Sequence, residues 1–225
     1  MIKFNNVGFA YEGNTLFSGV TLDIAPGSFH FLTGPSGVGK TTFLKLCYME
    51  MVATEGHVDI FDADVAGFDR DTVSRVRQRM GVVHQDCQFI DHLSVAENVM
   101  MPLAVSGHDA ADKSGDLSSL LSWVGLSGHA QSLPPTLSGG ERQRAALARA
   151  LIMSPDVIIA DEPTGNLDWE MSQRLLQLLL ELNKMGKTIL IASHDLNLIR
   201  NAKSEVNARV LRLKDKTLQL AGADL

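Results

Sequence analysis

A glycine-rich loop between an apolar segment and a helical one constrains this chain more than any other feature. The pattern G-x-x-x-x-G-K-[ST] is matched at every position by residues 34–41, which read GPSGVGKT. Residues 28–32 before the loop are mostly apolar, as in a buried strand, and residues 41–49 after it have a helical pattern. A strand, a tight loop and a helix in this order predict an α/β fold with a ligand site at the end of that strand.

The residue types in this loop suit a phosphate group. Glycine tolerates positive φ and close backbone approach, so successive N–H groups converge on phosphate oxygens at the positive end of the following helix. Lys40 adds a positive charge for the terminal phosphates, and the Thr41 hydroxyl is a suitable ligand for Mg²⁺. A purely structural turn would not account for the Lys-Thr pair. The residues expected to bind phosphate are Gly34, Pro35, Ser36, Gly37, Val38, Gly39, Lys40, Thr41 and Thr42.

Composition indicates one globular domain. The chain has 225 residues, 45% of them hydrophobic, and a net charge of −6. Runs of consecutive apolar residues are no longer than about four, whereas a membrane helix needs roughly 20. The N-terminus lacks the pattern of a signal peptide. A net acidic chain is a poor candidate for nucleic-acid binding, so we expect no nucleic-acid partner.

The two cysteines, Cys47 and Cys87, are far apart and belong to no CxxC or Cys/His cluster. This arrangement is typical of incidental thiols in a reducing compartment. We therefore expect a cytosolic chain without a disulfide or a structural metal.

Strand and helix patterns alternate along the chain. Strands are expected at residues 2–4, 20–24, 28–32, 157–160 and 188–192, with a closing hairpin at 209–213 and 217–220. Helices are expected at residues 41–49, from residue 138 onward and at 169–184, and the region 69–133 is expected to be mainly helical. The alternation predicts a mostly parallel sheet with helices on both faces.

Two acidic residues follow the apolar segment at 157–160. Asp161 and Glu162 would end a buried strand, where carboxylates are costly to bury without a ligand. The carboxyl ends of parallel strands are where α/β sheets bind ligands, so we expect Asp161 beside the phosphate loop, orienting Mg²⁺. Glu162 would polarise the attacking water. The alternative is a strand-end turn over the sequence Asp-Glu-Pro-Thr.

A second anion-binding surface is expected at residues 137–143, which read LSGGERQ and open a helix. Ser138, Gly139 and Gly140 present a serine cap and free N–H groups at that helix N-terminus. One nucleotide does not need two such surfaces from the same subunit. It does need both if two subunits pack head to tail and each offers this turn to the other's terminal phosphate.

With these motifs in place, the chain resembles the ATPase subunits of ABC transporters over essentially its full length. Five motifs occur in the order typical of that family. By resemblance, Tyr11 stacks on adenine, Gln85 contacts Mg²⁺ and the membrane partner, Asp161 and Glu162 are the Walker B pair, residues 165–168 form the D-loop with Asp168, and His194 is the switch histidine.

The resemblance implies a P-loop ATPase fold in a single domain of residues 1–225. It implies a mostly parallel core sheet, an N-terminal antiparallel β subdomain and a helical subdomain at about residues 86–150. The implied cofactors are ATP and Mg²⁺. The implied catalytic residues are Glu162, His194, Lys40 and Gln85, the implied Mg²⁺ ligands are Thr41, Gln85 and Asp161, and Ser138, Gly139, Gly140 and Asp168 act across a homodimer interface.

Within the family, residues 164–168 (TGNLD) are similar to the ATPases of cell division, lipoprotein release and macrolide export. Residues 31–37, 42–46 and 89–99 look most like the cell-division branch. That resemblance implies a peripheral ATPase on the cytoplasmic face of the bacterial inner membrane, paired with an integral membrane partner of the FtsX type. Its cycle would signal to cell-wall hydrolases. A lipoprotein-release or macrolide-export ATPase is the alternative.

Other interpretations stay open. The intact Glu162 and His194 argue against a non-hydrolysing nucleotide-binding module, and the absence of a long insertion or a second cassette argues against a soluble repair or translation ATPase. Trp169 either contacts the partner subunit or packs. Phe89, Ile90, Leu93 and Val95 either line a coupling groove or form subdomain core. Arg142, Arg144 and Arg149 form either a nucleic-acid patch or a solvated helix face.

Overall fold

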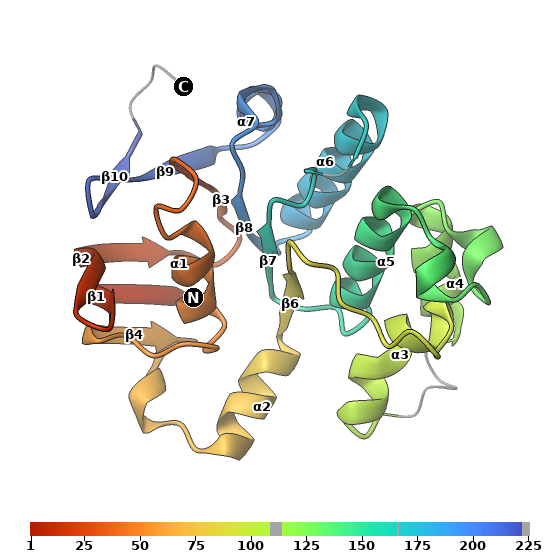
Figure 1. Ribbon diagram of the computed structural model, residues 1–225, viewed down its shortest axis with the longest axis horizontal. Helices are drawn as coiled ribbons and strands as arrows, with labels where there is room; N and C mark the ends of the chain where they lie inside the picture. The colour runs from red at the N-terminus through yellow and green to blue at the C-terminus, as the bar shows by residue number, and fades with distance from the viewer. Residues whose placement is uncertain (109–113, 166, 222–225) are drawn as a thin grey trace.

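The computed structural model describes residues 1–108, 114–165 and 167–221. Two sheets and seven α-helices make up this part of the chain (Figure 1). The larger sheet has six strands in the order β10-β9-β3-β8-β7-β6. Its strands are β3 (Phe29–Thr33), β6 (Met80–Val83), β7 (Val157–Asp161), β8 (Thr188–Ala192), β9 (Ala208–Lys214) and β10 (Thr217–Leu220).

All neighbours in this sheet are parallel except the terminal β9–β10 hairpin. The prediction of a mostly parallel α/β sheet is therefore confirmed. Every residue of β3, β7 and β8 is buried, as expected for central strands with helices on both faces.

Successive side chains of the central strands enter different cores. Ile158 and Ala160 of β7 join one cluster with α5 (Gly139–Leu151), α6 (Trp169–Lys184) and α7 (Leu196–Glu205). Val157 and Ile159 join another with α1 (Lys40–Cys47) and the antiparallel sheet. Because side chains alternate along a strand, the next residue on the α1 side is Asp161.

The smaller sheet is antiparallel, in the order β2-β1-β4-β5, and lies against α1 (Figure 1). It forms the N-terminal β subdomain that the family resemblance implied. Phe4 of β1 stacks on Phe43 of α1, with ring centroids 4.6 Å apart. The strands are β1 (Ile2–Tyr11), β2 (Asn14–Ile24), β4 (Glu55–Ile60) and β5 (Ala63–Asp64).

Helices α2 (Arg70–Gln78), α3 (Val95–Val105) and α4 (Ser114–Trp123) lie in the region 69–133, where helices were expected. The prediction overlooked β6, an edge strand of the core sheet. A Cβ at Gly81 in β6 would meet the carbonyl oxygen of Ala150, so glycine lets the strand approach α5 closely. Among the described residues, no helix has both the length and the apolar character that a bilayer span requires.

Candidate nucleotide-binding site

The glycine-rich loop joins β3 to α1 in left-handed backbone conformations. Gly34 and Gly39 have φ values of 150° and 110°. A Cβ at Gly34 would meet the carbonyl oxygen of Leu213, and one at Gly39 would lie 2.7 Å from Leu16. Glycine is therefore required at both ends of the loop for steric reasons.

Helix α1 opens toward the space enclosed by this loop. Its N-cap is Gly39, which has no side chain to occupy the first N–H groups of the helix. Lys40 lies at the same end, where its Nζ donates to the carbonyl oxygens of Gly34 at 3.0 Å and Pro35 at 3.3 Å. An ammonium held by two loop carbonyls beside open N–H groups suits a phosphate anion.

Asp161 faces α1 from the end of β7. Thr41 Oγ1 donates to Asp161 Oδ2 at 2.6 Å, and Asp161 is buried. Burial raises the pKa of the Asp161 carboxyl, with a smaller push from the Glu162 charge, while Thr41 and Lys40 act in the opposite direction. The donor set of a hydroxyl, a carboxylate and the amide of Gln85 in the same cleft fits the oxygen ligands that Mg²⁺ prefers.

Glu162 and His194 form an acid and imidazole pair at the mouth of the site. His194 Nδ1 lies 3.0 Å from Glu162 Oε2. The Glu162 side chain is only 14% exposed, whereas His194 is 77% exposed. Backbone pairing of Glu162 N–H with the Ala192 carbonyl at 2.9 Å ties the ends of β7 and β8 together. A shielded carboxylate with an exposed imidazole beside it can orient a water near a phosphate.

Tyr11, at the end of β1, also lines the cleft. Its hydroxyl is 3.2 Å from Thr42 Oγ1, and its ring packs edge-on against Phe9. With 45% of its surface exposed, the ring is available to a planar ligand. The cleft of about 790 Å³ is lined by Tyr11, Leu16, Gly34, Pro35, Ser36, Gly37, Gly39, Lys40, Thr41, Thr42, Gln85, Asp161, Glu162, Gly165 and His194.

The remaining predicted residues lie outside this cleft. Val38 packs against the core beside α1. Ser138 caps α5, and Gly139 lines a separate depression with Gln85 and residues 86–89. Gly140 follows in the first turn of α5, away from the cleft lining. The signature turn, residues 138–140, thus lies outside the cleft that the phosphate loop of the same chain lines.

Asp168 also lies outside the cleft lining. It caps α6 by accepting a hydrogen bond from the Met171 N–H at 2.8 Å. Its predicted neighbour Asn166 lies outside the described residues. Trp169, the next residue, is 58% exposed, so it does not pack into the core of a single chain.

Neither interpretation of the α5 arginines included the contacts of Arg142 and Arg149. Both side chains are partly buried, and both bind the segment after Gln85. Arg142 donates to the carbonyl oxygen of Cys87 at 3.0 Å, and Arg149 donates to that of Gln88 at 2.8 Å. Both guanidinium groups lie over the Phe89 ring, at 5.4 Å and 4.6 Å from its centroid. Sequence reasoning also missed Leu16 as a lining residue, since nothing in the β1–β2 hairpin marks it.

Comparison with known proteins agrees with this geometry. A family model described as "ABC transporter" matches residues 17–165. The chain is 41% identical to the cell division ATP-binding protein FtsE of Haemophilus influenzae, covering 89% of this chain and 93% of the relative. It is 38% identical to FtsE of Bacillus subtilis, covering 92% of each chain.

Solved structures give the same result. The dimeric ATP-binding cassette MJ0796, in a post-hydrolysis state bound to ADP and Pi, superposes with a TM-score of 0.89 at 33% identity over 97% of each chain. A second dimeric structure of that cassette gives a TM-score of 0.87 at 34% identity, again over 97% of each chain. The chain belongs to the ABC transporter ATPase family.

Proposed function

We propose that the chain is the ATP-hydrolysing subunit of a membrane complex that acts in bacterial cell division. The observation that carries the hydrolytic part is the pairing of Glu162 with His194 across from the phosphate loop in one cleft. The relatives described as cell division ATP-binding proteins, which align over nearly the whole chain, support the biological part.

Each side chain of the cleft has a distinct task in this proposal. Lys40 and the N–H groups at the start of α1 hold the terminal phosphates. Thr41, Gln85 and Asp161 would hold Mg²⁺, which would supply positive charge at the phosphates. Glu162 orients a water for in-line attack and accepts its proton. His194 fixes the Glu162 carboxylate and contacts the phosphate, where charge develops.

The signature turn completes the site from a second copy of the chain. Two copies packed head to tail would bring Ser138, Gly139 and Gly140 of one to the phosphate held by Lys40 of the other, with Asp168 near the interface. Two observations support this arrangement: the turn lies outside the cleft of its own chain, and the similar cassette MJ0796 is dimeric. Loss of the terminal phosphate would then open the dimer.

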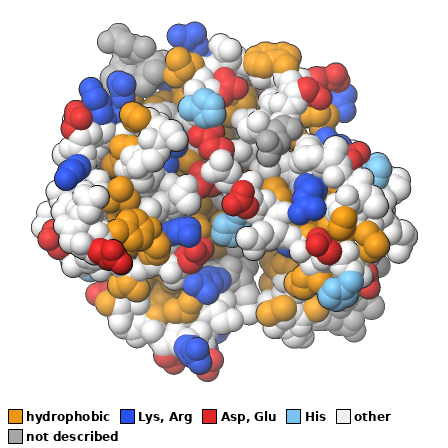
Figure 2. Space-filling model, in the orientation of Figure 1, with side chains coloured by type: hydrophobic (Ala, Val, Ile, Leu, Met, Phe, Trp, Pro, Cys, Tyr) orange, Lys and Arg blue, Asp and Glu red, His pale blue; other side chains and the backbone are white. Residues whose placement is uncertain are grey.

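A groove between α2 and α3 is suited to a helix of the integral membrane partner, which we propose to be of the FtsX type. Figure 2 shows the surface hollowed between these elements, with basic and hydrophobic side chains beside the hollow. The groove measures about 730 Å³, and the partner would hold the chain on the cytoplasmic face of the inner membrane. Its apolar lining includes Val73, Met80, Val82, Met101, Pro102, Val105 and Met153.

The residues first considered for a coupling groove do not line it. Val95 is fully buried in the subdomain core, and Phe89 packs partly buried against that core. Ile90 is 39% exposed, and its N–H donates to Asn98 Oδ1 at 2.9 Å. Phe89 and Ile90 belong to the loop after Gln85, and their contacts hold this loop between the nucleotide cleft and α3.

The hydrolytic role is tested by comparing Glu162→Gln with Glu181→Gln, which changes an exposed glutamate on α6. We expect Glu162→Gln to lower kcat for ATP at least about 100-fold while calorimetry still detects ATP binding, because the amide cannot accept the proton. Glu181→Gln should leave both unchanged. Normal turnover of Glu162→Gln would remove this residue from its role.

The membrane role is tested by co-purification of the tagged chain from bacterial membranes. Val105→Asp places a charge in the groove, and Val52→Asp is the matched control at another exposed valine. We expect an FtsX-type protein to co-purify with the parent chain and with Val52→Asp but not with Val105→Asp. Capture of a lipoprotein-release or macrolide-export permease instead would contradict the cell-division assignment and leave the ATPase assignment intact.

A further inference from the structure

The signature turn carries a carboxylate of its own. Glu141 Oε2 accepts hydrogen bonds from the backbone N–H and the hydroxyl of Ser138, both at 2.8 Å. The Ser138 oxygen accepts in turn from the Glu141 N–H at 3.3 Å. A hydroxyl has a single proton, so Ser138 cannot donate to a phosphate while it donates to Glu141.

The negative charge of the Glu141 carboxylate would also repel a phosphate bound at Ser138. Its hydrogen bonds from Ser138 lower the pKa of Glu141, with smaller contributions from His129 and Arg144, so the group is ionised near neutral pH. A phosphate that accepts from Ser138 would therefore lie close to a negative charge, and like charges at such a distance repel. Use of this turn as a phosphate site requires Glu141 to be moved and its charge to be offset.

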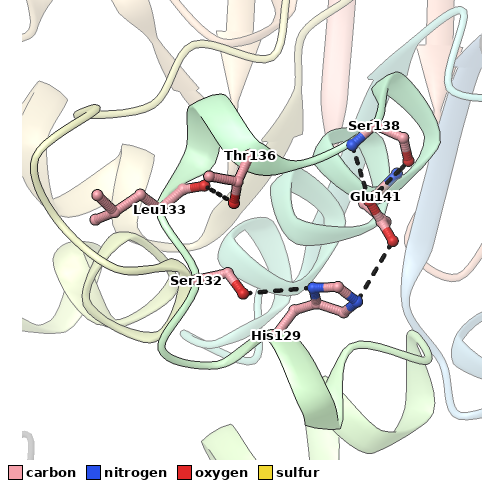
Figure 3. A network of polar contacts seen from close by, with 6 residues as sticks. All are labelled: His129, Ser132, Leu133, Thr136, Ser138 and Glu141. Carbon is pink, nitrogen blue, oxygen red and sulfur yellow. Dashed lines mark hydrogen bonds and ion pairs between the residues drawn. The ribbon is translucent and has the colours of Figure 1, made fainter.

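His129 lies on the far side of that carboxylate. Its Nε2 is 3.4 Å from Glu141 Oε1, the oxygen that Ser138 does not use. Its Nδ1 is 3.4 Å from Ser132 Oγ. Figure 3 shows the imidazole ring between Ser132 and Glu141, with Ser138 on the other side of the carboxylate. The imidazole can therefore pull Glu141 away from the serine.

The segment that carries His129 is fixed by backbone hydrogen bonds to α3. Val95 N–H donates to the Ser132 carbonyl and Ala96 N–H donates to that of Ala130, both at 2.9 Å. His129 N–H donates to the Leu126 carbonyl at 2.9 Å. The ring is thus held at Glu141 by the helical subdomain, and the His129 side chain remains 42% exposed.

The other charged groups around this loop have tasks elsewhere. Arg142 of α5 is bound to the carbonyls of Cys87 and Pro134, and Glu97 of α3 caps its own helix through Ser94. Asp116 of α4 lines a groove with Lys187. Arg144 makes a smaller positive contribution at Glu141. The ring nitrogen of His129 lies within 3.4 Å of the carboxylate.

We propose that His129 is a positioning residue for the signature serine. In its protonated form it draws the Glu141 carboxylate to itself and offsets its charge, so that the Ser138 hydroxyl turns to the terminal phosphate of the nucleotide held by a second copy. The inference rests on the proposed head-to-tail dimer. A positive charge at this position and phosphate binding at Ser138 therefore favour each other.

The test measures dimer dissociation constants by analytical ultracentrifugation with Mg²⁺ and ATP, in the Glu162→Gln background to prevent hydrolysis. We expect His129→Gln to weaken the dimer about tenfold. His129→Lys, which keeps a positive charge beside Glu141, should keep the dimer tight. His57→Gln changes an exposed histidine on β4 and should match the parent.

The same measurement in a Glu141→Gln background separates positioning from a structural role. There the carboxylate charge is absent, so His129→Gln should have no further effect. Equal losses in both backgrounds, or failure of His129→Lys to preserve the dimer, would overturn the inference while the dimer stands. If the parent binds ATP but never dimerises, the head-to-tail proposal fails and this inference fails with it.

Discussion

Glu162 combines its proposed chemical role with an unusual backbone conformation. Its φ of 48° lies in the left-handed region, which costs a non-glycine residue roughly 1–2 kcal/mol. The hydrogen bond from its N–H to the Ala192 carbonyl and the contact with His194 hold it there. This conformation turns the side chain from the end of β7 into the cleft, so the backbone strain serves the placement of the carboxylate.

Replacing Glu162 by glycine or by alanine should therefore give two variants that differ in stability but are equally inactive. We expect Glu162→Gly to be more stable than Glu162→Ala by up to about 1 kcal/mol, because glycine adopts this φ without a Cβ penalty. Both should lose turnover. Urea denaturation of the two variants measures the difference, and an alanine variant as stable as the glycine variant would contradict the strain.

His30 is a second residue whose surroundings set its chemistry. It is fully buried in β3, and burial lowers the pKa of its imidazole to about 4, with the Arg209 charge acting in the same direction. Its unfolded pKa is about 6.5, so the unfolded chain binds the proton more tightly. Stability from this residue is present above pH 6.5 and is lost as the pH falls toward 4.

We expect the free energy of unfolding to fall with acidification in a way that depends on His30. Between pH 7 and pH 5 the contribution of His30 should drop by about 2 kcal/mol. Urea titrations of the parent and of His30→Gln at both pH values measure it, with the exposed His57→Gln as the matched control. A His30→Gln variant that loses as much stability as the parent would show that another group is responsible.

At the scale of elements, α5 links the signature turn to the loop after Gln85. Ser138 caps its start, and Arg149 in its last turn binds the Gln88 carbonyl and lies over Phe89. One helix thus contacts both the surface offered to the second copy and the segment between the nucleotide and α3. A movement of α5 would therefore be transmitted to this loop.

Arg149→Met should release that loop. The substitution removes a charged hydrogen bond and a cation–π contact, so we expect a loss of about 2–3 kcal/mol in unfolding free energy and faster amide exchange across residues 86–91. Arg174→Met, which breaks an exposed i,i+4 pair on α6, should cost about 0.5 kcal/mol or less. Unchanged exchange in Arg149→Met would mean that the loop is held by other contacts.

The elements that sequence could predict are those with a strong and bounded pattern. Strands β7 and β8 are unbroken apolar runs, and α6 carries a leucine face, so each was found near its observed bounds. Strand β6 has four residues after an arginine-rich helix, and β4 turns only Val58 and Ile60 inward. Helix α7 buries three residues. Such short or sparse patterns are weak signals in a single sequence, and tertiary packing decides whether these segments form strands or helices.

At the scale of the whole molecule, the site follows from the alternation of side chains in the core sheet. The strands place their functional residues at one edge, where the cleft brings Lys40, Asp161, Glu162 and His194 together from motifs up to 154 positions apart in the sequence numbering. Sequence could predict that these residues lie together because each motif follows a strand. It could not locate the contacts of Arg142 and Arg149, because these depend on where α5 packs.

The head-to-tail dimer is the central claim, and it concerns two molecules. It is tested most directly by the ATP-dependent mass of Glu162→Gln in sedimentation, with Ser138→Arg added to block the signature turn. Ser118→Arg on α4, also in the Glu162→Gln background, is the matched control at an exposed serine. We predict a dimer with ATP for the parent and the control, and a monomer that still binds ATP for Ser138→Arg. An equally tight dimer of Ser138→Arg, or an ATP-bound parent that stays monomeric, would contradict the composite site.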